Sequence, residues 1–118
     1  MLKRLEPLDL AFQALADPSR RAIVQRLARG RASVSELAEP LAMSLPAVMQ
    51  HLALLESAGL VRSEKIGRVR TCRIDAARLL EAEQWIGRQR TEWEQRLDRF
   101  GDYVATLMTQ GDEDAPGT

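Results

Sequence analysis

Apolar residues recur at three- and four-residue intervals through the first half of the chain, which predicts a series of short helices. The first helix covers residues 7–16 and has Pro7 in its opening turn, where proline is well tolerated. The second starts at Asp17 and Pro18, a typical N-cap followed by a typical first residue, and ends at Gly30. Its basic side chains are expected on the outer face or at its flanks: Arg20, Arg21 and Arg26.

The third predicted helix is short and covers residues 35–41. Either Ser33 or Ser35 can cap its N-terminus, and Ser33 and Glu36 have the spacing of a capping box. The apolar residues that it turns inward are Leu37, Ala38 and Leu41.

A fourth helix starts at Ser44, accepts Pro46 in its first turn and ends at Gly59. Its inward stripe consists of Val48, Leu52 and Leu55. Because this helix follows the third one after a tight turn, the two together predict a helix-turn-helix.

The periodicity then changes to that of β-structure. Residues 60–65 predict a strand, Gly67 and Arg68 a turn, and residues 69–74 a returning strand. The result is a hairpin, or wing, beside the helix-turn-helix. Alternation places Arg68, Arg70 and Cys72 on one face of the hairpin, and Val69, Thr71 and Arg73 on the other.

Residues 76–109 predict one long helix without proline. Apolar residues recur in it every seven positions, and two more fill the intermediate positions: Leu79, Ile86, Trp93, Phe100 and Leu107, with Leu97 and Val104. About 30 helical residues span roughly 45 Å, more than the radius of a small domain, so the heptad pattern favours a partner helix over packing within the domain. We therefore expect a homodimer whose interface contains Leu8, Phe12, Ile86, Trp93, Leu97, Phe100, Val104 and Leu107.

The predicted fold is mostly α, a winged helix-turn-helix in the order α-α-α-α-β-β-α with a long C-terminal dimerisation helix. Its 118 residues suit one domain, over 1–110, followed by a disordered acidic tail over 111–118. No segment resembles a signal peptide or a membrane-spanning helix, so we expect a cytoplasmic protein without a membrane partner. Although the net charge is zero, residues 62–74 carry five basic groups and one acidic group, which suits a polyanionic partner.

Three segments of the chain occur in the order and spacing of a known family: LADPSRRAIVQRLARG, SVSELAEPLAMSLPAVMQHLALLESAGLV and RSEKIGRVRTCRI. Over residues 8–75 the chain resembles the ArsR (arsenic-repressor, SmtB-like) family of winged-helix transcriptional repressors. The long last helix resembles a subgroup without the metal-binding cysteines. The resemblance implies a homodimer joined through its first and last helices, which binds imperfect palindromes in double-stranded DNA at promoters.

The resemblance also implies that the N-terminal part of the fourth helix enters the major groove. The positions that would read bases are Leu45, Pro46, Met49 and Gln50. Gln50 can pair with adenine through two hydrogen bonds, whereas the other three can meet only thymine methyl groups or sugars. His51 is either a phosphate contact or a packing or capping residue. With the wing cations, which suit phosphates or the minor groove, the predicted DNA-contacting residues are Ser44, Leu45, Pro46, Met49, Gln50, His51, Lys65, Arg68 and Arg70.

We expect no metal site and no cofactor. Ser33 and Ser35 occupy the positions of the family's Cys-x-Cys pair, and the one histidine, His51, lies in the fourth helix. The one cysteine, Cys72, is expected to be a packed strand residue rather than a sensor. No catalytic motif occurs, so an enzyme is not expected.

The predicted function is a dimeric, sequence-specific DNA-binding regulator, a repressor at a pseudo-palindromic operator. Two alternatives stay open. One is a repressor that responds to a small organic molecule bound between the first and last helices, near Phe12, Trp85, Trp93 and Tyr103. The other is a protein-interaction module that has lost DNA binding, which the zero net charge would suit.

Overall fold

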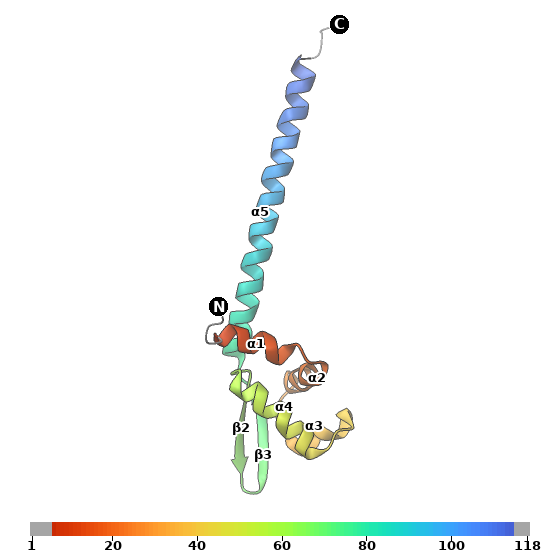
Figure 1. The fold of residues 1–118 in the computed structure, drawn as a ribbon, viewed down its shortest axis with the longest axis vertical. Coiled ribbons are helices and arrows are strands. Elements are labelled where there is room, and N and C mark those ends of the chain that lie inside the picture. The colour runs from red at the N-terminus through yellow and green to blue at the C-terminus, as the bar shows by residue number, and fades with distance from the viewer. Residues whose placement is uncertain (1–5, 115–118) are drawn as a thin grey trace, which may run out of the picture. The chain divides into compact units, whose positions relative to one another are not determined.

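A computed structural model describes residues 6–114 of the chain. Five helices and three strands follow one another in the order α1 (Pro7–Leu15), α2 (Pro18–Leu27), β1 (Ala32–Ser33), α3 (Val34–Leu41), α4 (Leu45–Ser57), β2 (Val61–Ile66), β3 (Val69–Ile74) and α5 (Ala76–Asp114). Figure 1 shows the helix-turn-helix of α3 and α4 and the hairpin of β2 and β3. The predicted winged helix-turn-helix is confirmed, with the ends of α1–α4 and of both wing strands within three residues of their expected places, whereas α5 extends five residues beyond residue 109.

The chain divides into two compact units between Glu83 and Gln84. The first unit holds α1–α4, the sheet and the start of α5, and the second consists of the rest of α5. The sequence predicted a single domain and a disordered segment from residue 111, but α5 continues to Asp114. Residues 115–118 of the predicted tail lie outside the described part. No described helix has an apolar stretch long enough to span a membrane.

Helix α4 is the centre of the first unit. Its predicted stripe of Val48, Leu52 and Leu55 is almost completely buried. The helix packs against α1, α2, α3 and β2. The side chains that complete this core come from every other element around it: Ala11, Ala14, Ile23, Leu27, Ala32, Leu37, Leu60, Val61 and Cys72. Each large apolar side chain in such a core contributes about 1.5–3 kcal/mol, so this packing fixes the orientation of α4.

Polar caps define where the helices of the first unit begin. Helix α3 starts at Val34, so its cap is Ser33, which forms a reciprocal capping box with Glu36 through two 3.1 Å hydrogen bonds. The Ser33 amide and hydroxyl, by hydrogen bonding, hold the pKa of the Glu36 carboxyl below its usual value. The Ser44 hydroxyl accepts a 3.3 Å hydrogen bond from the amide of Ala47 and caps α4, as predicted.

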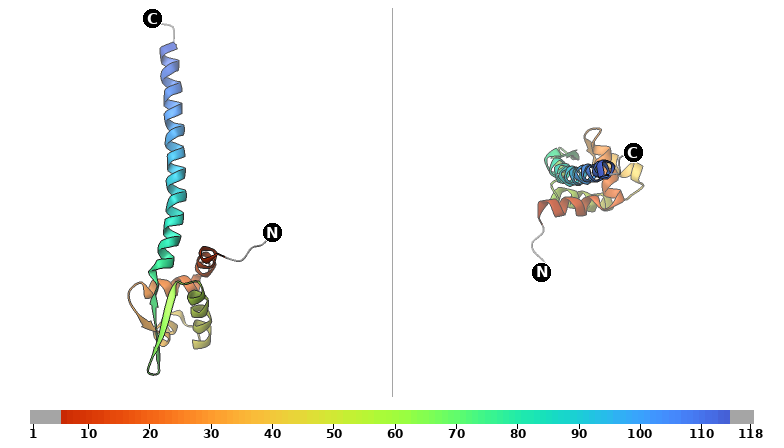
Figure 2. Two further views of the ribbon diagram at one scale, coloured as in Figure 1. Left: turned by 90° about the vertical axis from the view of Figure 1, so that its left-hand side faces the viewer. Right: turned by 90° about the horizontal axis from the view of Figure 1, so that it is seen from above.

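The sheet has three antiparallel strands in the order β1-β3-β2. The hairpin turns at Gly67, whose φ of +63° favours glycine. Its turn lies beyond the helices of the first unit (Figure 2). The sequence did not predict β1, because two residues are too few to show alternation; it pairs Ala32 with Cys72 and Ser33 with Thr71. This pairing ties the start of α3 to the wing.

Ala42, in the turn between α3 and α4, has a φ of +52° and is the one non-glycine residue of the described chain in the left-handed region. Replacing it with glycine relieves the clash of its Cβ, although glycine also loses more freedom on folding. Ala42→Gly is expected to raise the free energy of unfolding by about 0.5–1 kcal/mol. Urea denaturation at one fixed protein concentration measures this change.

The matched control is Ala53→Gly on the exposed face of α4, where the backbone is right-handed helical. The same chemical change there should lower the free energy of unfolding by about 0.5–1 kcal/mol. Equal losses from both variants would show that the Ala42 backbone is not strained.

Candidate nucleic-acid interface

The N-terminal half of α4 presents its side chains to solvent on the side away from the core. Leu45 is 49% exposed and Met49 is 40% exposed. Pro46 and Gln50 are exposed as well. Because Val48, on the same turns, is fully buried, these residues face outward, as the sequence predicted.

The tip of the wing carries cations without protein partners. The side chains of Lys65 and Arg68 form no hydrogen bond or ion pair with any residue of the described chain and are free to meet an anion. Arg70 differs, because its guanidinium donates a 2.8 Å hydrogen bond to the Ser63 hydroxyl. That hydroxyl donates in turn to the Glu56 carboxylate on α4. Arg70, Ser63 and Glu56 therefore tie the wing to the helix beside it.

At the base of the wing, one arginine is neutralised by a neighbouring carboxylate. Arg62 Nε lies 2.7 Å from Asp75 Oδ2. This hydrogen bond holds the pKa of the Asp75 carboxyl below its usual value. Arg62 is therefore paired within the protein, unlike Lys65 and Arg68 near the tip.

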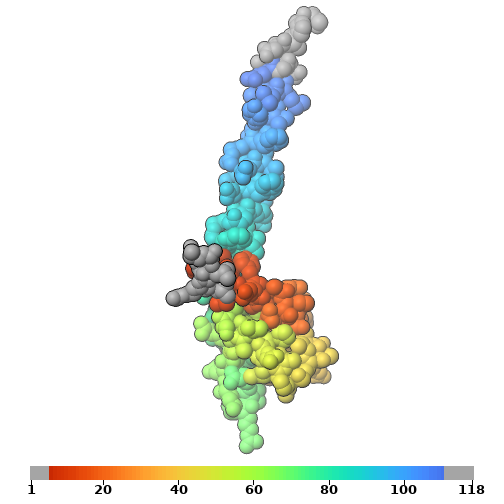
Figure 3. Space-filling view, viewed as in Figure 1, coloured from red at the N-terminus to blue at the C-terminus, as the bar shows by residue number. Residues whose placement is uncertain are grey.

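A groove of about 390 Å³ joins the two surfaces. Its walls come from the start of α3, the start of α4 and the returning strand of the wing: Ser33, Val34, Ser35, Leu45, Met49, Arg68, Val69 and Arg70. We call it the helix–wing groove. It brings together four of the predicted DNA-contacting residues, and it adds Val34 and Val69, which the sequence did not single out. Figure 3 shows the wing as a protrusion from the first unit.

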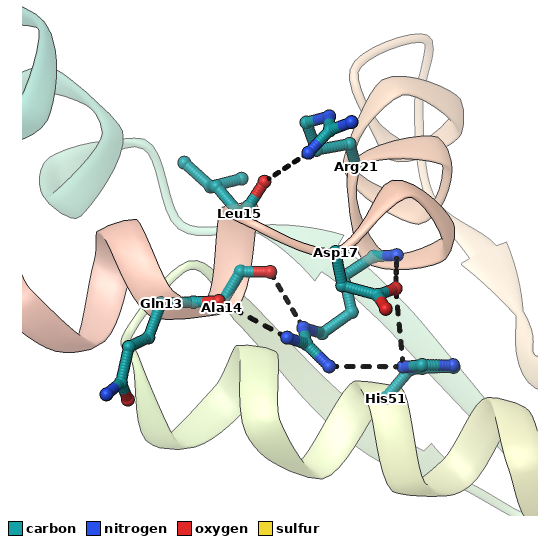
Figure 4. Close-up of polar contacts among 7 residues, drawn as sticks. Gln13, Ala14, Leu15, Asp17, Arg21 and His51 are labelled. Carbon is teal, nitrogen blue, oxygen red and sulfur yellow. Dashed lines mark hydrogen bonds and ion pairs between the residues drawn. The ribbon is translucent and has the colours of Figure 1, made fainter.

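His51 faces α2 instead of lying with the exposed residues of α4. Its Nδ1 atom lies 3.5 Å from the Arg20 guanidinium and 3.9 Å from Asp17 Oδ2, and the side chain is 19% exposed (Figure 4). Of the two roles left open for His51, this geometry favours packing within the protein over a phosphate contact. The reason is that the Nδ1 atom of the ring already lies beside Asp17 and Arg20 within the protein.

Asp17 and Arg20 also join α2 to α1. The Asp17 carboxylate accepts a 3.0 Å hydrogen bond from the Arg20 amide, which lowers the pKa of that carboxyl together with the nearby charges of Arg20 and His51. The Arg20 guanidinium donates to the carbonyl oxygens of Ala14 and Gln13, at 2.7 and 3.2 Å. Arg21 likewise donates to the Leu15 carbonyl at 2.8 Å. The two arginines expected on the outer face or flanks of α2 therefore satisfy the open carbonyls at the end of α1.

Cys72 is a packed strand residue, as predicted. Its side chain is fully buried, and burial raises the pKa of the thiol, which keeps it protonated and unreactive. Ser33, at one of the two positions where the family carries thiols, caps α3. Within residues 6–114, no group of three or more His, Cys, Asp or Glu side chains is placed to hold a metal ion.

The second unit exposes a continuous apolar stripe. Trp93, Leu97, Phe100, Val104 and Leu107 are spaced by four, three, four and three residues. Trp93 is 60% exposed and Phe100 is 66% exposed. Ile86, one heptad earlier, is also exposed, whereas Leu8 and Phe12 are half-buried on α1 in the first unit.

Comparison with known proteins agrees with this arrangement. A helix-turn-helix domain family matches residues 15–64. The HTH-type transcriptional regulator Rv2034 of Mycobacterium tuberculosis is 44% identical over 98 residues, which cover 80% of this chain and 92% of the relative. The crystal structure of the ArsR family transcriptional regulator RHA00566 is 49% identical, with a TM-score of 0.71, over 80% of this chain and 97% of that one. The chain belongs to the ArsR family of transcriptional regulators.

A further ArsR-family neighbour bears on assembly. The winged helix-turn-helix domain of Mb0332 from Mycobacterium bovis, described as homodimeric and as a possible ArsR-family regulator, is 27% identical. Its TM-score is 0.59, over 78% of this chain and 94% of that one. The chain is therefore a winged helix-turn-helix transcriptional regulator, and its relatives are regulators rather than enzymes.

Variants at the adjacent residues Gln50 and His51 test how α4 is oriented. His51→Ala removes the contacts with Asp17 and Arg20 and is expected to lower the free energy of unfolding by about 0.5–1 kcal/mol, without changing the preference for any base pair. Urea denaturation and binding titrations on DNA measure the two effects. Unchanged stability together with a selective loss of DNA affinity would place His51 in the interface instead.

Proposed function

We propose that this ArsR-family protein is a cytoplasmic homodimer that represses transcription by binding a pseudo-palindromic operator. The observation that carries the proposal is the helix–wing groove. It brings the exposed start of α4 and two arginines of the wing, Arg68 and Arg70, to one surface, in a chain whose relatives are transcriptional regulators. Side chains on the helix are suited to base edges, and cations on the wing are suited to phosphates.

The homodimer is proposed from the apolar stripe of the second unit. A helix with large apolar side chains exposed at four- and three-residue spacing is stabilised when a second helix covers them. A second copy of this chain offers the same stripe, and a two-fold axis makes such a contact self-complementary. The half-buried Leu8 and Phe12 of α1 are proposed to extend the interface.

Two-fold symmetry determines the form of the operator. Two recognition helices related by such an axis read half-sites about 34 Å apart, one turn of the DNA helix. The bases of the half-sites are proposed to be read by the start of α4, namely Ser44, Leu45, Pro46, Met49 and Gln50. Lys65, Arg68 and Arg70 are proposed to hold the backbone from the wing.

Sedimentation at micromolar concentration is expected to give about twice the chain mass of 13.2 kDa. Leu97→Glu together with Phe100→Glu puts charge into the apolar stripe, and this variant is expected to sediment as a monomer. Gln95→Glu, on the polar side of the same helix, should remain a dimer. A wild-type chain that sediments as a monomer would refute both the dimer and the half-site spacing.

The proposed division of roles, with α4 reading bases and the wing holding the backbone, gives a second prediction. Gln50→Ala should cost about 1–3 kcal/mol on the cognate site and relax the preference at one base pair per half-site. Arg68→Ala should weaken cognate and scrambled DNA alike, and reduce the slope of log K against log salt by about one per arginine, or about two per dimer. Fluorescence anisotropy titrations of both duplexes at several salt concentrations measure these changes.

The outcomes separate the proposal from its alternatives. A changed base preference with an unchanged salt slope in Arg68→Ala would mean that the wing reads sequence. Absence of binding to any duplex would favour a protein-interaction module over a DNA-binding repressor. A small organic effector stays a prediction, and it would first be sought near the aromatic residues that the sequence suggests for it, Phe12, Trp85, Trp93 and Tyr103.

A further inference from the structure

We infer that the helix–wing groove recognises the C5-methyl group of a pyrimidine in the major groove, so that each half-site carries a thymine that uracil cannot replace. This inference rests on the proposed DNA-binding function and names the chemistry that gives it specificity. Because 5-methylcytosine carries its methyl group at the same ring position, the groove should also favour it over cytosine.

The first reason is the apolar surface that the groove presents. Its walls include Val34 of α3, Leu45 and Met49 of α4 and Val69 of the wing. Leu45, Met49 and Val69 are 49%, 40% and 51% exposed. Aliphatic side chains at the base-reading end of a recognition helix cannot form hydrogen bonds with base edges. They gain free energy only by covering another apolar group.

The second reason is the chemistry of the major groove. Adenine, guanine and cytosine present only donors and acceptors there, and these would lose their water against an aliphatic wall without receiving a hydrogen bond. The thymine methyl is the apolar group that unmodified base pairs present on this side. A thymine is therefore the base whose edge matches this surface.

The third reason is the charge at the groove's margin. Arg68 and Arg70 line the same groove from the wing, and the Arg68 guanidinium has no partner within the described chain. Arg70 is held in place by its hydrogen bond to Ser63. Aliphatic side chains beside two guanidinium groups complement a methyl group beside a sugar–phosphate backbone.

The first experiment is a selection from a random duplex library with the full-length protein, followed by replacement of each selected thymine with deoxyuridine. Loss of one buried methyl group should weaken binding about fourfold, and loss in both half-sites about 15-fold. Replacing the sensitive T·A pair with C·G should also weaken binding, and 5-methylcytosine in place of that cytosine should restore part of the affinity.

Protein variants show whether the groove causes the effect. In Leu45→Ala and Met49→Ala, deoxyuridine should weaken binding much less than it does in the wild-type protein, because the surface that covers the methyl group has been removed. Leu54→Ala is the matched control, since Leu54 is an exposed leucine of the same helix that lies outside the groove. It should keep the full effect of deoxyuridine. Circular dichroism confirms that each variant is folded.

The outcomes distinguish this inference from the function on which it rests. If no sequence is enriched, the proposed sequence-specific DNA binding fails. If a site is enriched but deoxyuridine changes affinity at none of its thymines, or if guanine occupies the position that Leu45 and Met49 control, the function stands and the inference is overturned. A deoxyuridine effect that persists in Leu45→Ala and Met49→Ala would assign methyl recognition to another part of the protein.

Discussion

The packing of one stripe of helix α4 determines what the rest of the molecule can do. Val48, Leu52 and Leu55 are buried among α1, α2, α3 and the sheet, so the helix cannot rotate without exposing them. That constraint turns Leu45 and Met49 outward beside the wing. The surface proposed to read DNA is therefore a consequence of the core. Its precision follows from close packing, which tolerates little change in volume or position.

Polar contacts then fix the elements around α4. Arg20 joins α2 to the carbonyl end of α1 and reaches the ring of His51, while Asp17 caps α2 on the same side (Figure 4). On the other side, Glu56 holds the wing through Ser63. These contacts place the hairpin at a defined distance from α4. A binding site that is already ordered before its ligand arrives loses less binding free energy to the ordering of its own residues.

Features that depend only on residues close together in the sequence could be predicted from it. Ser44, Pro46 and the apolar stripe are all local signals, so α4 was predicted to within two residues. The first strand, β1, was missed because two residues are too few to show alternation and because its pairing with β3 involves residues about 40 positions apart. The same reason applies to Val34 and Val69, whose place in one groove depends on how the hairpin packs beside α3. The role of Arg20 likewise depends on the angle between two helices, which composition and periodicity do not contain.

The most direct test of this arrangement is nuclear magnetic resonance of the methionine methyl groups during titration with a selected duplex. The chain has four methionines. Met49 lies in the helix–wing groove, whereas Met108 lies in the second unit on α5. The Met49 methyl signal should shift strongly when DNA binds, and the Met108 signal should stay in place. An unmoved Met49 signal with saturated DNA binding would contradict the central claim that the buried stripe of α4 turns its opposite face toward the bases.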